Sequence, residues 1–262
     1  MQRNLIILLI SAAVLLAGGA AAGAAVLKVG ATSVPHAEIL EVVVPLLEKE
    51  GITLEIIEFS DYVRPNLALQ DGELAANFFQ HVPYLEDFNK ERGSDLVALV
   101  GIHVEPLGVY SAKLSSLAEL PKRAQIAIPN DATNGGRALL LLQAAGLIKV
   151  AEQAGIAPTL FDITENELDL RFHELEAAQL ARSLPDVQAA VINGNYALQA
   201  GLNPIRDAIF LEGAESPYVN VLAIRAGDEE DAGLLKLAAA LVSEEVKSFI
   251  LEKYEGSVVP VF

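Results

Sequence analysis

Short apolar segments alternate with amphipathic helical segments from Val26 to the end of the chain, and this alternation constrains the fold more than any other feature. Residues 26–30 and 52–59 are typical of strands, while residues 35–50 carry apolar side chains at helical spacing along one face. Strands that alternate with helices in this way form βαβ units around a largely parallel sheet. The chain is therefore expected to adopt an α/β fold.

A second set of units begins at Gln125 and ends before a late apolar strand at residues 218–225. This arrangement predicts two lobes joined by two crossing strands, with residues 26–112 and 222–262 in the first lobe and residues 113–221 in the second. A single doubly wound sheet would give a similar pattern. In either fold a ligand would bind at the carboxyl ends of strands or in the cleft between lobes.

The charge and composition exclude several classes of partner. The formal net charge is −17, which argues against nucleic acid and anionic lipid, because both require a surplus of lysine and arginine. Cysteine is absent from the sequence, so disulfides, thiol nucleophiles and cysteine-based zinc sites are excluded. With 52% hydrophobic and 20% charged residues, the composition is that of a globular protein.

The first 25 residues have the composition of an export signal. Arg3 precedes an almost unbroken apolar run at residues 5–16, and small residues follow at 17–25. The apolar run is shorter than the roughly 20 residues that span a bilayer, although the alanine and glycine tract would lengthen it. We therefore expect an exported protein whose signal, residues 1–25, is removed, with an uncleaved membrane anchor as the alternative.

Residues 125–142 combine a short strand, a group of helix-capping residues, two glycines and a leucine-rich helical run. Asn130, Asp131 and Thr133 signal the start of a helix, and the glycines would let a ligand approach the backbone closely. Arg137 would then lie about one turn inside a helix whose N-terminal N–H groups favour anions. The segment suits a small carboxylate, and an ordinary strand–loop–helix with a solvated arginine is the alternative.

Polar and aromatic side chains also gather where other strands give way to helices, as a site for an amphipathic molecule requires. Tyr62 follows one strand. Phe78 and Phe79 would point to opposite faces of the next strand, so only one of them should face a cleft. All three could equally belong to the core, and His81 could cap the following helix or pack rather than contact a ligand.

Three asparagines complete the polar candidates. Asn193 and Asn195 follow the buried strand at residues 187–192, where a helix cap and a surface amide are the simplest interpretation. Asn220 lies inside an apolar strand, and a buried amide must find hydrogen-bond partners. Asn220 therefore favours a functional role more than the other two do.

Enzyme and metal signatures are scarce. The sequence contains no Gly-x-Ser-x-Gly motif, no Gly-Lys-Ser/Thr phosphate loop and no His-Glu-x-x-His motif. His103 and Glu105 could share one face of a strand as metal ligands, but two ligands do not make a metal site, and a solvated or paired histidine explains them better. We therefore expect no catalytic activity, no metal and no cofactor.

Laid end to end, these segments resemble the methionine-binding lipoproteins of the NlpA type, the substrate-binding components of methionine-uptake ABC transporters. The resemblance runs from about Leu27 to Phe262. It is carried by the segments VPHAEIL at 34–40, FSDYVRPN at 59–66, NFFQHVPY at 77–84, HVEP at 103–106, IPNDATNGGR at 128–137, VINGNY at 191–196 and SPYVN at 216–220. So many long matches in the same order make the resemblance specific.

The resemblance implies a two-lobed periplasmic-binding-protein-like fold that closes around one amino acid in its cleft. Side chains from several segments would line the site: Arg137, Asn195, Asn220, Tyr62, Phe79, His81, Tyr84 and Asn193. The guanidinium fork of Arg137 would grip the α-carboxylate, and Asn195 and Asn220 would hold the α-amino and carboxyl groups. Shape would decide selectivity, because the energies between a thioether and aromatic rings are modest.

The resemblance also implies a non-catalytic protein that captures L-methionine or a close analogue and delivers it to an ABC permease. We expect it to act as a monomer. A Met-containing dipeptide, D-methionine or a related small amino acid are alternative ligands, and an enzyme that processes an amino acid is the alternative from another class.

One departure from the family concerns the membrane. Leu16, Ala17 and Gly18 resemble the start of a lipobox, but Gly19 stands where the family carries its lipidated cysteine. Without a thiol no thioether-linked lipid can form. The protein is therefore expected in the periplasm or at the cell surface, either soluble or anchored by an uncleaved signal.

Overall fold

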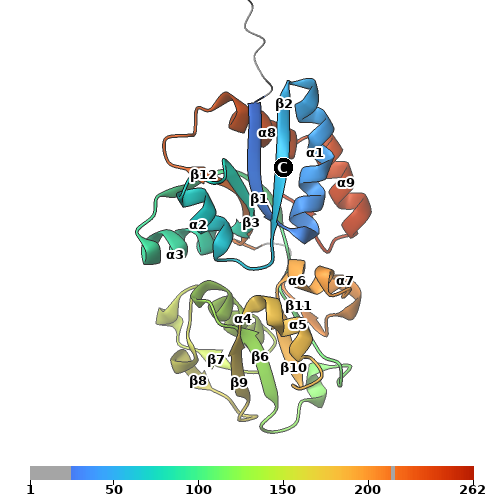
Figure 1. The fold of residues 1–262 in the computed structure, drawn as a ribbon. Helices are drawn as coiled ribbons and strands as arrows, with labels where there is room; N and C mark the ends of the chain where they lie inside the picture. The colour runs from blue at the N-terminus through green and yellow to red at the C-terminus, as the bar shows by residue number, and fades with distance from the viewer. Residues whose placement is uncertain (1–24, 214–215) are drawn as a thin grey trace, which may run out of the picture.

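The computed structural model describes residues 25–213 and 216–262, which form two lobes stacked along one long axis (Figure 1). Each lobe contains a β-sheet flanked by helices, and the chain passes between the lobes twice. The expected export signal, residues 1–25, lies outside the described residues except for Ala25. Within the described part of the chain, no helix is both long and apolar enough to cross a membrane.

The first lobe is built on a six-stranded sheet of order β13-β4-β12-β3-β1-β2. Its strands are β1 (Ala25–Thr32), β2 (Ile52–Phe59), β3 (Ala76–His81), β4 (Leu96–Val104), β12 (Val219–Arg225) and β13 (Val259–Pro260). Strand β1 pairs in parallel with β2 and β3, whereas β12 runs antiparallel to both β3 and β4. The strand that returns from the second lobe therefore lies inside the sheet, between two strands of the first lobe.

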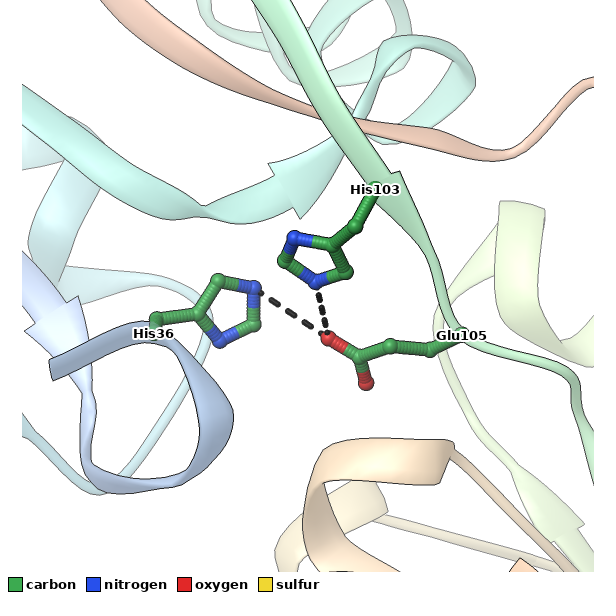
Figure 2. Close-up of side chains that lie close together, drawn as sticks. All are labelled: His36, His103 and Glu105. Carbon is green, nitrogen blue, oxygen red and sulfur yellow. Dashed lines mark hydrogen bonds and ion pairs between the residues drawn. The ribbon is translucent and has the colours of Figure 1, made fainter. Parts of the chain in front are cut away.

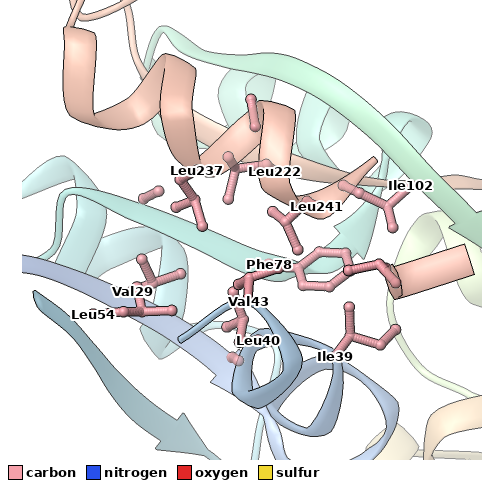
Figure 3. Packing of buried hydrophobic residues seen from close by; sticks show 14 of the residues in the cluster. Val29, Ile39, Leu40, Val43, Leu54, Phe78, Ile102, Leu222, Leu237 and Leu241 are labelled. Carbon is pink, nitrogen blue, oxygen red and sulfur yellow. The ribbon is translucent and has the colours of Figure 1, made fainter. Parts of the chain in front are cut away.

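Amphipathic helices cover this sheet: α1 (Glu38–Lys49), α2 (Arg64–Gln70), α3 (Val82–Arg92), α8 (Ala232–Leu241) and α9 (Glu244–Tyr254). On α1, Ile39, Leu40 and Val43 recur at helical spacing and are fully buried. Figure 3 shows them in one cluster with Phe78 of β3 and Leu241 of α8. Each fully buried aliphatic side chain stabilises the lobe by about 1.5–3 kcal/mol, so burial of its apolar face holds α1 against the sheet.

The second lobe is built on a five-stranded sheet of order β11-β5-β10-β6-β9. Its strands are β5 (Gly108–Tyr110), β6 (Gln125–Pro129), β9 (Arg171–Leu175), β10 (Ala189–Ile192) and β11 (Phe210–Leu211), and a separate pair is formed by β7 (Lys149–Val150) and β8 (Ile163–Glu165). The helices are α4 (Ala132–Ala144), α5 (Leu180–Ser183), α6 (Gly194–Gln199) and α7 (Pro204–Asp207). Buried leucines of α4, Leu139 and Leu142, pack against Ile126 of β6 and Val191 of β10.

The prediction of a largely parallel sheet is wrong, because both sheets are mixed. Strand β6 pairs in parallel with β9 and β10, but β5 runs antiparallel to β10 and β11. The crossings explain the direction of β5 and β12, because a strand that arrives from the other lobe enters its sheet from the opposite end. Strand β13 also runs antiparallel to its neighbour β4, but at the edge of the first sheet and without a crossing before it.

The strand pairing also differs from the expected lobe ranges, 26–112 with 222–262 and 113–221. Strand β5 pairs with β10 and β11 in the second sheet, whereas β12 lies wholly in the first sheet. By sheet membership the first lobe runs to Val104 and resumes at Val219. The apolar run at residues 96–111 carries no sign of the crossing inside it, because both of its halves form strands.

Candidate ligand-binding site

A cavity lies at the junction of the two lobes and is lined by residues of both. Every side chain nominated from the sequence lines it: Tyr62, Phe79, His81, Tyr84, Arg137, Asn193, Asn195 and Asn220. The remaining lining residues, which the sequence analysis did not nominate, are Gln80, Glu105, Asn134 and Gly194. The fold thus brings together side chains that lie more than a hundred positions apart in the sequence.

The first lobe supplies one wall of the cavity from the end of β3 and the start of α3. Phe79 lines the cavity while Phe78 is fully buried in the core, as the alternation of strand side chains predicts. His81 ends β3 and caps α3, because its Nδ1 accepts the backbone N–H of Tyr84 at 3.2 Å. Tyr62 reaches the cavity from the loop between β2 and α2.

The second lobe supplies the opposite wall from α4 and α6. Arg137 lies in α4, Asn193 directly precedes α6, and Asn195 lies inside α6. Asn195 is only 2% exposed, so its interpretation as a surface amide is wrong. Asn220 reaches the same cavity from β12, the strand that returns to the first lobe.

Arg137 is 4% exposed and already paired, so the alternative of a solvated arginine is also wrong. Nε donates to Oε1 of Glu212 at 3.0 Å, while Nη2 donates to Oε2 of Glu212 and to the backbone oxygen of Glu105, the latter at 2.9 Å. The ring of Tyr218 lies 4.1 Å from the guanidinium carbon. Only Nη1 lacks an acceptor among the described residues, so Arg137 can offer one nitrogen to a ligand, not a two-pronged fork.

The N-terminus of α4 is capped by the protein itself. Oδ1 of Asp131 accepts the backbone N–H of Asn134 at 2.9 Å and the hydroxyl of Thr133 at 3.1 Å. The expected anion site at this helix start is therefore occupied by the carboxylate of Asp131. Burial raises the pKa of this carboxyl group.

The two glycines of α4 make room for protein backbone rather than for a ligand. A Cβ on Gly135 would lie 2.9 Å from the backbone oxygen of Pro129, and a Cβ on Gly136 would lie 2.6 Å from Cα of Ala157. Contacts this short cannot be relieved by a side-chain movement, because the neighbouring atoms belong to the backbone. The expectation that these glycines admit a ligand is therefore wrong.

Two side-chain hydrogen bonds join the lobes across the cavity. The hydroxyl of Tyr62 donates to Oδ1 of Asn195 at 2.5 Å, and Nε2 of His81 donates to Oδ1 of Asn134 at 3.1 Å. The donor role of Nε2 follows from the accepting role of Nδ1, since a neutral imidazole carries one hydrogen. Burial lowers the pKa of His81 to about 3, which keeps this ring neutral at pH 7. The lobes are thus closed on one another in this structure.

Aromatic rings form one side of the cavity. The ring of Tyr62 lies 5.9 Å from that of Phe79 and 5.8 Å from that of Tyr84, and the ring of His81 stands edge-on to Tyr84 at 6.2 Å. Burial raises the pKa of Tyr62 and that of Tyr84, so both hydroxyls are neutral donors at physiological pH. This side of the cavity is therefore aromatic and uncharged.

Two buried polar atoms of the cavity lack a hydrogen-bond partner among the described residues: Oδ1 of Asn193 and Nδ2 of Asn195. The amide nitrogen of Asn193 is engaged, because it donates to Asn134 at 2.7 Å. Buried polar groups are nearly always hydrogen-bonded. One acceptor and one donor in the same cavity therefore suit a ligand that carries both kinds of group.

Behind the cavity, His36, His103 and Glu105 form a buried cluster in which both rings face one carboxylate oxygen (Figure 2). Oε1 of Glu105 lies 2.8 Å from Nε2 of His103 and 3.3 Å from Nε2 of His36. In the described part of the chain, this is the one group of histidine and carboxylate side chains close enough together to hold a metal ion. The hydrogen bond from His103 to Glu105 and the proximity of His36 account for the geometry without one. Of the two interpretations given for His103, solvated or paired, the structure shows the paired one.

Sequence reasoning missed two lining residues that bear on chemistry. Asn134 was treated only as part of a helix-start segment, yet it is 1% exposed and connects Asp131, His81 and Asn193. Glu105 was considered beside His103 alone, because its second partner, His36, lies 69 positions away. The available signal was a glutamate placed between an apolar strand and a proline.

Comparison with known proteins gives concordant matches. The family model described as NlpA lipoprotein matches residues 27–262. The D-methionine-binding lipoprotein MetQ of Escherichia coli is 44% identical over 236 residues, which cover 89% of this chain and 87% of that protein. The membrane lipoprotein TpN32 of Treponema pallidum is 42% identical over 228 residues, covering 87% of this chain and 85% of that protein.

Solved structures match over a similar span. A nutrient-binding protein from Burkholderia cenocepacia, solved bound to methionine, superposes with a TM-score of 0.88 at 49% identity, covering 90% of this chain and 100% of that one. The lipoprotein Tp32 of Treponema pallidum superposes with a TM-score of 0.88 at 41% identity, covering 90% of this chain and 99% of that one. The two-lobed α/β architecture is therefore shared with these proteins.

Proposed function

The chain belongs to the NlpA lipoprotein family, and from this premise and the cavity between its lobes we propose that it captures methionine and delivers it to an ABC permease. The observation that supports the proposal most is the chemistry of the cavity. It combines an aromatic side with an unpartnered donor and an unpartnered acceptor, which suits an amino acid with an apolar side chain. The names of the related MetQ protein and of the Burkholderia cenocepacia structure agree with this ligand.

In this proposal the α-carboxylate binds Nη1 of Arg137 and the amide nitrogens of Asn195 and Asn220. Nδ2 of Asn195 is a buried donor without an acceptor among the described residues. Oδ1 of Asn220 is held by Nε2 of His36 at 3.1 Å, which leaves the Nδ2 hydrogens of Asn220 for the ligand. Oδ1 of Asn193, the buried unpartnered acceptor, receives a hydrogen from the α-ammonium group.

The thioether side chain lies against Tyr62, Phe79 and Tyr84, with His81 beside them. Contacts between sulfur and an aromatic ring contribute about 0.3–1.5 kcal/mol each. His81 is neutral at pH 7, so this side places no charge against the apolar chain. Selectivity then follows from the shape of the aromatic side more than from one strong contact.

Binding of another ligand, or catalysis, is the alternative to methionine capture. D-methionine or a related small amino acid presents the same groups in another arrangement. The lining residues contain no serine, cysteine or lysine that could act as a nucleophile, so we propose binding without catalysis.

Delivery follows from closure of the lobes. A ligand that contacts both walls stabilises the closed form by its greater affinity for that form, and the permease recognises the closed protein. We propose that the protein is exported, acts as a monomer and reaches its permease at the outer face of the cytoplasmic membrane. Gly19 in place of the lipobox cysteine means that any membrane attachment uses the uncleaved signal instead of a lipid.

Isothermal titration of residues 26–262 with L-methionine tests the proposal, with D-methionine and a Met-containing dipeptide as competitors. We expect one binding site per chain, and no heat at millimolar L-methionine would refute it. Arg137→Ala should weaken binding by about 1.5–3 kcal/mol, as loss of one hydrogen bond to a charged group does. Arg171→Ala, an exposed arginine of the same lobe, is the matched control and should leave the affinity unchanged.

A further inference from the structure

The charges around the cavity do not balance. Arg137 and Glu212 form a bidentate pair whose charges cancel. Glu105 is the other charged side chain that lines the cavity, and its side chain is only 7% exposed. An ionised carboxylate is costly to bury unless a positive charge lies beside it.

The geometry around Glu105 favours the ionised carboxylate. Nε2 of His103 lies 2.8 Å and Nε2 of His36 lies 3.3 Å from the same carboxylate oxygen, Oε1, so both rings direct an N–H group at one accepting atom. Within the described ranges, no lysine or arginine lies within ion-pair distance of the Glu105 carboxylate; its only such partners are the two histidines.

Neither histidine supplies the missing positive charge (Figure 2). Nδ1 of His103 is buried without a partner, so a doubly protonated ring would bury an unsatisfied N–H. His103 is therefore the neutral tautomer that donates from Nε2. Burial lowers the pKa of His36 to about 4, and its Nε2 faces the oxygens of Glu105 and Asn220, so this ring is also a neutral donor at pH 7.

We propose that Glu105 binds the α-ammonium group of the ligand and makes this group, rather than the α-carboxylate, the main electrostatic determinant of recognition. The inference rests on the proposed function, because it assumes that an amino acid occupies the cavity. The ammonium group compensates the buried charge of Glu105, and Oδ1 of Asn193 accepts a further hydrogen from it. The α-carboxylate of the ligand contacts Arg137, whose charge is already neutralised by Glu212. This contact therefore contributes less binding free energy than the contact between the ammonium group and Glu105.

Three ligands that differ in one group each test this order of importance. Isothermal titration at pH 7 compares L-methionine with L-methioninol, which lacks the carboxylate, and with 4-(methylthio)butanoate, which lacks the amino group. The butanoate adds a second negative charge beside Glu105, so it should bind at least about tenfold more weakly than methioninol. Equal or tighter binding of the butanoate would overturn the inference while leaving methionine capture intact. Absence of binding by all three would overturn both.

Removal of the Glu105 charge provides the second measurement. Glu105→Gln should weaken L-methionine binding by about 30-fold or more, in line with losses at truncated buried charge pairs, and should narrow the gap between methioninol and the butanoate. Glu174→Gln, an exposed glutamate of β9, is the control and should change neither. If the difference in affinity between methioninol and the butanoate is unchanged in Glu105→Gln, the inference is contradicted. If circular dichroism shows that Glu105→Gln does not fold, the wild-type ligand series still decides.

A metal ion is the remaining source of positive charge. Zn²⁺ retained in a one-to-one ratio after purification, and lost together with native stability on treatment with a chelator, would compensate Glu105 without a ligand and would overturn the inference. We expect purified protein to contain less than about 0.1 equivalent of metal by elemental analysis and to bind L-methionine equally well with and without chelator.

Discussion

Acidification should destabilise the protein through two buried histidines. Burial lowers the pKa of His36 to about 4 and that of His81 to about 3, whereas histidine in an unfolded chain titrates near pH 6.5. Between these values the unfolded chain binds more protons than the folded chain, so the free energy of unfolding falls as the pH drops below about 6.5. Glu105 has a lowered pKa, and its contribution is present above the unfolded value near 4.5 and is lost only at lower pH.

The magnitude follows from the width of the pH window. At pH 5 both rings are still neutral in the folded chain. This pH lies about 1.5 units below the pKa of histidine in the unfolded chain, and each unit corresponds to about 1.36 kcal/mol. Each histidine therefore lowers the free energy of unfolding by about 2 kcal/mol, and the two together by about 4 kcal/mol relative to pH 7. Asp131 has a raised pKa and acts in the opposite direction, so a variant is needed to isolate the histidines.

Urea unfolding of wild type, His36→Asn and His173→Asn at pH 7 and pH 5 provides that comparison. His36→Asn removes the contribution of His36, so the fall in the free energy of unfolding from pH 7 to pH 5 should be smaller by about 2 kcal/mol. His173 is exposed on β9 and should leave the decrease unchanged. Equal stability of the wild type at both pH values, or an unchanged decrease in His36→Asn, would refute the reasoning.

Two further substitutions probe packing and closure. Gly136→Ala places a methyl group against backbone and should lower the free energy of unfolding by about 1–3 kcal/mol in urea. The added Cβ of Gly213→Ala meets nothing within 4 Å among the described residues, so this variant should be neutral; equal stabilities of the two variants would contradict the packing argument. Tyr62→Phe removes a hydrogen bond between the lobes and should weaken L-methionine binding by about 0.5–1.5 kcal/mol in titration calorimetry. Tyr110→Phe removes a buried hydroxyl that has no partner in the described structure and should not weaken it.

Much of the fold could be predicted because its longer elements carry a clear hydrophobic period. The strand expected at residues 52–59 matches β2 in full, and the helical spacing noted at residues 35–50 covers α1. Elements of two to four residues, such as α7 and β11, escaped prediction because so short a segment shows no period. The antiparallel direction of β5 and β12 was missed for another reason: the direction in which these strands enter their sheets depends on where the chain crosses between lobes.

The sequence predicted which residues line the site better than it predicted how these residues pair with one another. The cluster of polar residues at strand ends, together with the family resemblance, nominated side chains that do line one cavity. The pairing of Arg137 with Glu212 joins residues 75 positions apart, and that of His36 with Glu105 joins residues in different segments of the chain. Neither pairing has a local signature, so the sequence could not reveal that Arg137 is already neutralised and that Glu105 carries the surplus charge.

Native mass spectrometry of residues 26–262, purified without added ligand and then incubated with L-methionine, tests the central claim most directly. The account predicts a one-to-one complex whose added mass equals one methionine and which disappears when the protein is denatured. Arg171→Ala should form the same complex, and Arg137→Ala should form much less of it. A spectrum that shows only the mass of the bare chain at millimolar L-methionine would contradict the claim that the closed cavity is a methionine site.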